Sequence, residues 1–133
     1  MKKTFTLFLA LAVSLLTLQS SAQMYIVGDA PFGGWNPAGG VQMTAQSDGT
    51  YTYTTTISGK VYFVFGDHLA SSSSDWSTFN NNYRYGPLSD GQVVTAGTWV
   101  TTQKSREGAY CFTGNGSQYL ITFDKNTTRF KVS

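Results

Sequence analysis

The sequence is poor in the side chains on which most enzymes and metal sites depend. It contains one histidine (His68), one cysteine (Cys111) and one glutamate, together with six aspartates. A zinc site needs three or four imidazole or thiolate ligands, and a serine or cysteine nucleophile needs a neighbouring base. No GxSxG motif accompanies His68. Asp67 and Asp75 are the one carboxylate pair that could serve a glycosidase. We therefore expect no metal or other cofactor, and an enzyme is the third-ranked interpretation.

The sequence also lacks clustered positive charge and long hydrophobic runs. Apart from Lys2 and Lys3, seven basic residues balance seven acidic ones. Such a chain has no electrostatic footprint for nucleic acid or for an anionic membrane surface. Its one apolar run, residues 5–18, is shorter than the roughly 18 residues that a membrane-spanning helix needs. We expect neither nucleic acid as a partner nor an integral membrane segment.

The N-terminus has the pattern of an export signal. Lys2 and Lys3 precede the apolar run, and the small residues Ser20 and Ala22 follow it, which predicts a signal peptide over residues 1–22 that is cut after Ala22. Residues 23–133 are then a single domain in the periplasm or outside the cell. No cysteine lies near the cleavage point, so a lipoprotein is not expected. Cys111 is alone and is expected to be a small buried side chain.

Alternating side chains dominate the mature sequence. In residues 50–57 the tyrosines and Ile57 point one way and the threonines the other, which predicts a half-buried strand. Ser58 and Gly59 then predict a tight hairpin into residues 60–65, a strand with two apolar faces. Further strands are predicted at residues 24–28, 98–103, 109–112, 119–123 and 129–132. Turns are expected at residues 47–49, 114–116 and 125–127.

This pattern indicates an all-β fold. About seven short antiparallel strands in roughly 100 residues favour an immunoglobulin-like β-sandwich, and a small closed barrel is the alternative. Two segments do not read as strands, residues 29–40 around Trp35 and residues 66–91 around Trp76. Long loops in a small domain are often functional. The spacing of Trp76 and Phe79 also predicts one helical turn that ends before Asn80.

The second of these segments is rich in aromatic and polar side chains, as in "DWSTFNNNYRYGP". A pyranose ring has a flat face of C–H groups and a rim of hydroxyls, so a site for it needs exposed rings and planar polar groups. Other roles are open for some of these residues. Phe79 is expected to anchor the loop, Arg84 to bind a ligand or to pair with Asp75 or Asp90, and Tyr85 to bind a ligand or cap a turn. Trp99 is expected in the core or on the sheet surface.

Several short motifs occur in a recognisable order between residues 24 and 87. They are Gly28, Gly34-Trp35, Met43-Thr44, Asp48-Gly49-Thr50-Tyr51, the aromatic strand Tyr62–Phe65 and Trp76. In this order and spacing the chain resembles the SusE/SusF-type starch-binding modules of glycan-foraging gut bacteria, and more distantly the E-set glycogen- and starch-binding modules. The resemblance implies that Trp35 and Trp76 sandwich an α-glucan. It also implies possible partners among outer-membrane glycan-uptake proteins.

The leading hypothesis is an exported, non-catalytic module that binds an oligosaccharide or polysaccharide of the starch type. Trp35 and Trp76 would stack on sugar rings, and hydroxyl groups would be bound by Asn80, Asn82, Tyr83 and Arg84. The alternative is an exported protein-interaction domain, an inhibitor or an envelope assembly factor, that uses the same aromatic loop, because Tyr, Trp and Arg are also the anchors of protein interfaces. A sugar platform needs the two tryptophans side by side, whereas a protein contact needs only one.

Overall fold

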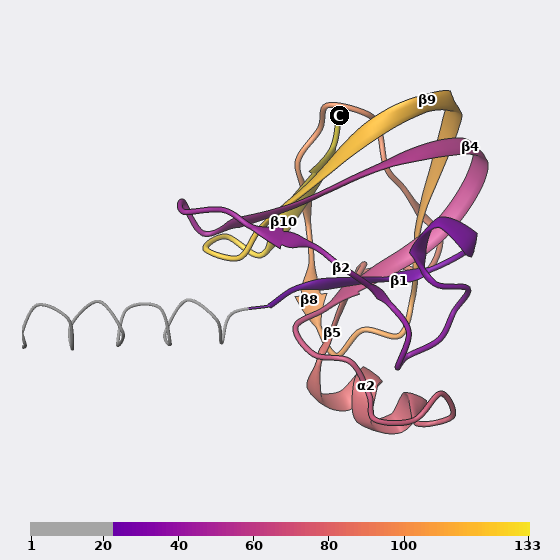
Figure 1. Cartoon of the computed structure of the whole chain (residues 1–133), viewed down its shortest axis with the longest axis vertical. Coiled ribbons are helices and arrows are strands. Elements are labelled where there is room, and N and C mark those ends of the chain that lie inside the picture. Colours follow the sequence, from indigo (N-terminus) through magenta and orange to yellow (C-terminus); the bar gives the residue numbers. More distant parts are fainter. Residues whose placement is uncertain (1–22) are drawn as a thin grey trace, which may run out of the picture.

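The structure, a computed structural model, describes residues 23–133; the predicted signal peptide, residues 1–22, lies outside the described residues. Two long strands organise the fold, β4 (Thr50–Gly66) and β9 (Tyr110–Asp124). They run antiparallel, with Thr50 opposite Asp124 at one end and Phe63 opposite Tyr110 at the other. Both strands bend together over the top of the molecule in Figure 1. The bend turns one sheet into two facing layers.

Short strands extend this central pair on both sides. The sheet order is β2-β1-β4-β9-β10-β7, while β3 and β5 pair with β4, β6 pairs with β9, and β8 pairs with β5. These strands are β1 (Tyr25–Gly28), β2 (Val41–Gln42), β3 (Thr44–Ala45), β5 (Arg84–Gly86), β6 (Gln92–Val93), β7 (Val100–Thr101), β8 (Gln103–Lys104) and β10 (Arg129–Val132). The helices are the 3-10 helix η1 (Ala30–Phe32) and α2 (Trp76–Asn82).

The predicted all-β sandwich is confirmed, but the expected count of about seven strands is wrong, because the described residues form ten. Half of them, β2, β3, β6, β7 and β8, have only two residues, which is too short for an alternating pattern to show in the sequence. A closed barrel is also not formed: no pairing in residues 23–133 joins the end strands β2 and β7.

Two predicted turns are wrong, and the same contact explains both. Gly59 pairs with Gly114 inside the continuous β4–β9 ladder, so neither Ser58-Gly59 nor residues 114–116 reverse the chain. The ladder instead shifts register between Thr56 and Ser58. A β-bulge needs the same small, flexible residues as a turn, and a glycine within a strand often marks one. The expected turns at residues 47–49 and 125–127 are confirmed.

The two faces of β4 cover two separate cores. The large core lies between the layers and contains Phe63 and Phe65, which are fully buried with Tyr110, Phe123 and Phe130. Val64 points the other way, into a smaller core with Val27, Ala70, Phe79 and Ala109. The prediction that this strand has two apolar faces is thus confirmed. Cys111 is buried, as expected.

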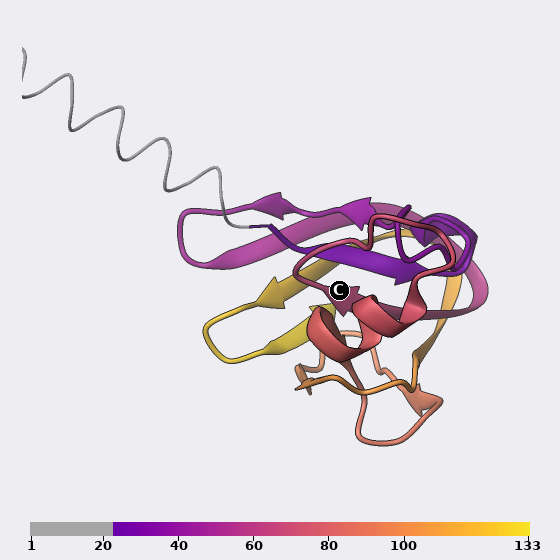
Figure 2. The ribbon, with the colours of Figure 1, turned by 90° about the horizontal axis from the view of Figure 1, so that it is seen from below.

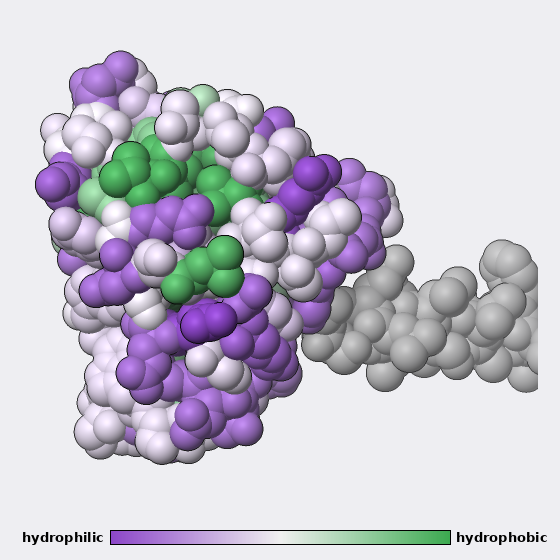
Figure 3. Space-filling model, turned by 180° about the vertical axis from the view of Figure 1, so that it is seen from behind, coloured by the Kyte–Doolittle hydropathy of each residue, from purple (hydrophilic) through white to green (hydrophobic). Residues whose placement is uncertain are grey.

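The smaller core explains where the helix lies. Phe79 of α2 is fully buried in it, so the helix sits below the sheet with Trp76 at its start (Figures 1 and 2). The predicted helical turn is confirmed but continues to Asn82. The apolar side chains most exposed to solvent lie elsewhere, at Leu88 (58% exposed) before β6 and Val93 (74%) within it. Figure 3 shows hydrophobic atoms gathered on one face and bordered by hydrophilic ones.

Candidate functional site

Trp35 is held in place by an unusual backbone. Gly33, Gly34 and Trp35 all have positive φ, at 89°, 73° and 57°. The left-handed region is uncommon for a residue with a bulky side chain, and such outliers gather at functional sites. Asp29 holds the Trp35 side chain in place. Its carboxylate accepts the indole Nε1–H of Trp35 at 2.7 Å and the backbone N–H of Tyr62 at 2.7 Å. The loop after β1 is therefore pinned to β4 with its indole in a set position.

Trp76 is positioned by the start of α2. Asp75 is the N-cap, and its carboxylate accepts the backbone N–H of Thr78 at 3.1 Å. The bonds from Thr78 lower the pKa of Asp75, so the cap stays ionised at neutral pH. The Trp76 ring meets the edge of the buried Phe79 ring, with centroids 6.0 Å apart and planes at 84°. Phe79 is thus the anchor that the sequence predicted.

The two tryptophans lie next to each other. Their ring centroids are 6.3 Å apart, their planes are inclined by 46°, and both side chains are half-buried on the outside of the smaller core. Each stacking contact takes about 3.5–4.0 Å, so a sugar between two facing rings needs roughly 7–8 Å. The sandwich implied by the family resemblance is therefore not the arrangement seen. The rings instead form an angled platform.

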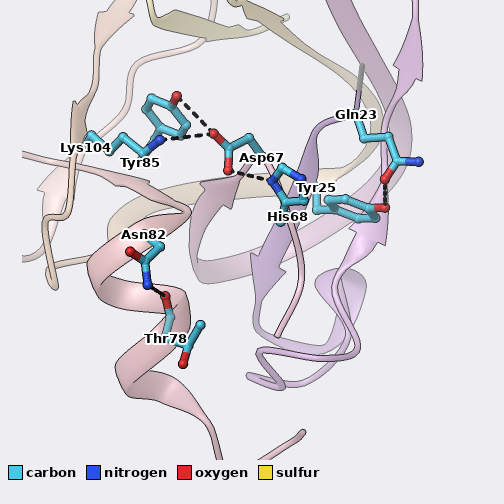
Figure 4. Close-up of polar contacts among 8 residues, drawn as sticks. All are labelled: Gln23, Tyr25, Asp67, His68, Thr78, Asn82, Tyr85 and Lys104. Atoms are coloured by element: carbon cyan, nitrogen blue, oxygen red, sulfur yellow. Dashed lines mark hydrogen bonds and ion pairs between the residues drawn. The ribbon is translucent and has the colours of Figure 1, made fainter. Parts of the chain in front are cut away.

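Asn80, Asn82 and Tyr83 differ in burial and in the hydrogen bonds that they make within the protein. Asn80 is half-buried, and its Oδ1 accepts from Arg84 at 2.8 Å. Asn82 is exposed, and its Nδ2 donates to the carbonyl of Thr78 at 3.1 Å (Figure 4). Tyr83 is half-buried at the C-terminal end of α2. Asn80 and Tyr83, four and seven residues after Trp76, lie on its side of the helix, whereas Asn82, six residues after it, is turned about 120° away.

Arg84 is only 4% exposed. Its guanidinium donates to Asn80 Oδ1, to the carbonyl of Gly108 at 3.0 Å and to the carbonyl of Glu107. Burial lowers its pKa. Of the two roles open in the sequence, the geometry favours the structural one, but the partners are an amide and two carbonyls and not Asp75 or Asp90. Arg84 ties the end of α2 to the chain before β9, and we leave it out of the proposed sugar contacts.

Replacing Arg84 by methionine is expected to destabilise the protein by about 2–3 kcal/mol, because the hydrogen bonds from its buried, charged guanidinium to Asn80, Glu107 and Gly108 are lost. Thermal unfolding of the variant measures this loss. Arg106→Met is the matched control, since Arg106 is exposed and donates only to Gln103. An equal loss of stability in both variants would contradict the structural role of Arg84.

The carboxylates that an enzyme would need are both occupied. Asp75 caps α2, and Asp67 accepts from Tyr85 at 3.3 Å, from Lys104 at 3.2 Å and from His68 at 3.2 Å (Figure 4). These bonds hold the loop together. Tyr85 packs in the core and donates its hydroxyl to Asp67. No group of three or more metal-ligating side chains occurs in residues 23–133. None of the helices described is long and apolar enough to cross a membrane.

Comparison with protein families identifies the module. Residues 19–133 match the family described as SusF, first starch-specific CBM. The chain belongs to this family. Carbohydrate-binding modules are non-catalytic domains, so this SusF-type module is a glycan-binding domain and not an enzyme.

Comparison with solved structures agrees with this assignment. The crystal structure of SusF from Bacteroides thetaiotaomicron matches with a TM-score of 0.62 at 23% identity, over 83% of this chain. The match covers 23% of that chain, so the SusF-type module corresponds to less than a quarter of SusF. At this identity the similarity shows the shared fold. No curated protein matches significantly.

Sequence reasoning missed two residues that shape the site. Asp29 orients the indole of Trp35, and the ring of His68 lies 4.9 Å from that of Tyr83. The sequence suggests for His68 only the roles of a catalytic base or a metal ligand. No spacing rule links Asp29 to a tryptophan six residues later, and the contact between His68 and Tyr83 depends on how the loop folds back on α2.

Proposed function

We propose that this SusF-type module binds a starch-type α-glucan by laying sugar rings on the platform formed by Trp35 and Trp76. The observation that carries the proposal is the pairing of these two half-buried indoles, 6.3 Å apart, from segments 41 residues apart in the sequence. An aromatic ring packs well against the C–H face of a pyranose. A contact that needed only one ring would not require this convergence, so the pairing favours a glycan over a protein partner.

The angle between the rings supports the choice of an α-glucan. Consecutive glucose units of an α-1,4-linked chain turn relative to one another, so the chain curves, whereas a β-1,4-linked chain is nearly flat. Two adjoining rings inclined by 46° follow a curved chain better than a flat one. The starch-specific description of the family points the same way.

Polar groups on α2 complete the proposed site. Because Arg84 holds Oδ1 of Asn80, the Nδ2 group of that amide is left to donate to a hydroxyl. Asn82 is exposed and has a free Oδ1 acceptor in its amide, and Tyr83 has a phenol that both donates and accepts. Trp76, Asn80 and Tyr83 thus lie on one side of the helix, with Asn82 turned away from them. Arg84 acts as a positioning residue.

The test is calorimetry with maltoheptaose and with cellohexaose. We expect maltoheptaose to bind with a Kd between about 1 μM and 1 mM, because a few stacked rings leave little free energy after the ligand is ordered. Cellohexaose is expected to bind at least about tenfold more weakly. Equal affinity for both would contradict the α-glucan, and binding of neither would contradict the glycan platform as a whole.

A signal peptide over residues 1–22 would carry this activity out of the cytoplasm. An exported module of this family would serve in the capture of glucans, and the outer-membrane glycan-uptake proteins implied by the family resemblance are its proposed partners.

A further inference from the structure

A second pair of rings lies at the other end of α2. Tyr83 follows the last helical residue, and the ring of His68 packs against it with centroids 4.9 Å apart and planes inclined by 35°. The His68 side chain is 66% exposed. Tyr83 is thus covered on one side by His68, and His68 itself is open to solvent.

This pair belongs to the same surface as the tryptophan platform. Trp35, Trp76, Tyr83 and Leu69 all pack on the outside of the smaller core. The segment 67–70, which carries His68, is tied at both ends: the N–H of Asp67 donates to the carbonyl of Tyr83 at 3.1 Å, and that of Ala70 to the carbonyl of Pro37 at 2.8 Å. This segment therefore connects the end of α2 with the loop that carries Trp35.

The length of α2 keeps Trp76 apart from the pair formed by Tyr83 and His68. Trp76 and Tyr83 are seven residues apart, about 10 Å along a helix that rises 1.5 Å per residue. Asn80, four residues after Trp76, lies between them on the same helical face. One pyranose ring can rest on Trp76 or reach His68, but it cannot do both. A longer oligosaccharide can.

His68 has both features that carbohydrate recognition needs. Nδ1 lies 3.2 Å from Oδ1 of Asp67, whose other oxygen is bound by Lys104 and Tyr85 (Figure 4). The carboxylate favours a proton on Nδ1, so Nε2 of the neutral ring is the acceptor. A largely exposed ring, oriented by the bond between Nδ1 and Asp67, thus has its other nitrogen left to accept from a ligand.

We propose that His68, supported by Tyr83 and oriented by Asp67, is a second contact point for the glucan that lies on Trp35 and Trp76, and that it makes the site prefer long chains. This inference rests on the proposed function. It adds a preference for long ligands to that function. Short oligosaccharides use the tryptophan platform alone, and longer ones also reach His68.

The experiment compares maltotriose with maltoheptaose by calorimetry on the wild-type protein and on His68→Ala. The wild type is expected to bind maltoheptaose about tenfold more tightly than maltotriose, and the variant to lose about three- to tenfold in affinity for maltoheptaose only. His68→Phe, which keeps the ring and removes the acceptor, is expected to be intermediate. Leu120→Ala, an exposed position on β9, is the control and should match the wild type.

The outcomes separate the inference from the proposed function. If His68→Ala weakens both ligands equally or neither, while Trp76→Ala weakens both, the second contact point is wrong and the tryptophan platform stands. If the wild type binds neither maltooligosaccharide, the proposed function is wrong and the inference falls with it. Because His68 is exposed, circular dichroism of the variant is expected to match that of the wild type.

Discussion

Trp76→Ala is expected to weaken maltoheptaose binding by about 2 kcal/mol, the size typical of an aromatic hot spot, which corresponds to a roughly thirtyfold higher Kd. Trp76 supplies one of the two rings of the platform and is the first residue of α2. Its removal keeps the Asp75 cap but takes away the ring that packs against Phe79. The affinity should therefore be measured by calorimetry at a temperature at which thermal unfolding shows the variant to be fully folded.

The third tryptophan provides the matched control. Trp99 is half-buried beside β7, and its ring is covered by the cations of Arg129 at 4.6 Å and Lys131 at 4.8 Å. Both come from β10 and pack on Trp99 by cation–π contact. Trp99→Ala should leave glucan affinity unchanged. If Trp99→Ala lowered glucan affinity as much as Trp76→Ala, any tryptophan would serve and the platform would not explain binding.

Trp35→Ala is a less direct test of the platform. The substitution removes the indole that Asp29 holds and also changes a residue with a φ of 57°. Any loss of affinity would then combine the missing ring with a rearranged loop. Trp76 is the better position for that reason.

Gly114→Ala is expected to lower the free energy of unfolding by about 3 kcal/mol, at the upper end of typical overpacking effects. A Cβ at Gly114 would lie 2.2 Å from the carbonyl oxygen of Ile57 and 2.7 Å from its carbonyl carbon. These are backbone atoms at the bulge of β4, so they cannot move aside without breaking the ladder. A drop in melting temperature of roughly 12–20 °C should follow.

Gly116 is the control for this prediction. It has a φ of 90°, and a Cβ there would meet no atom within 4 Å. Gly116→Ala therefore carries only the cost of the left-handed backbone, about 1–2 kcal/mol. If residues 114–116 formed the turn that the sequence suggested, Gly116→Ala would be the more harmful of the two. Thermal unfolding of both variants distinguishes a continuous β9 from a turn.

The candidate site was predictable in part. The loops of Trp35 and Trp76 stood out because their composition cannot form strands, and the motif order pointed to the starch-binding modules. The role of Arg84 was not predictable, because an arginine near a site serves equally well as a ligand contact or as a buried brace. What decides between them is the position of the Glu107 and Gly108 carbonyls, which lie more than twenty residues away in the sequence.

The sequence by itself determined the strand faces, the helical turn at Trp76 and the class of the fold, because alternation and i, i+3 spacing are local properties of the chain. Only the tertiary structure decided that β4 and β9 continue through Gly59 and Gly114, because the bulge forms only when the two strands pair with each other. It also decided the angle between the two indoles and the place of His68. The angle and the place of His68 depend on how residues 29–40, residues 66–75 and α2 pack around a core of five residues that are distant in the sequence.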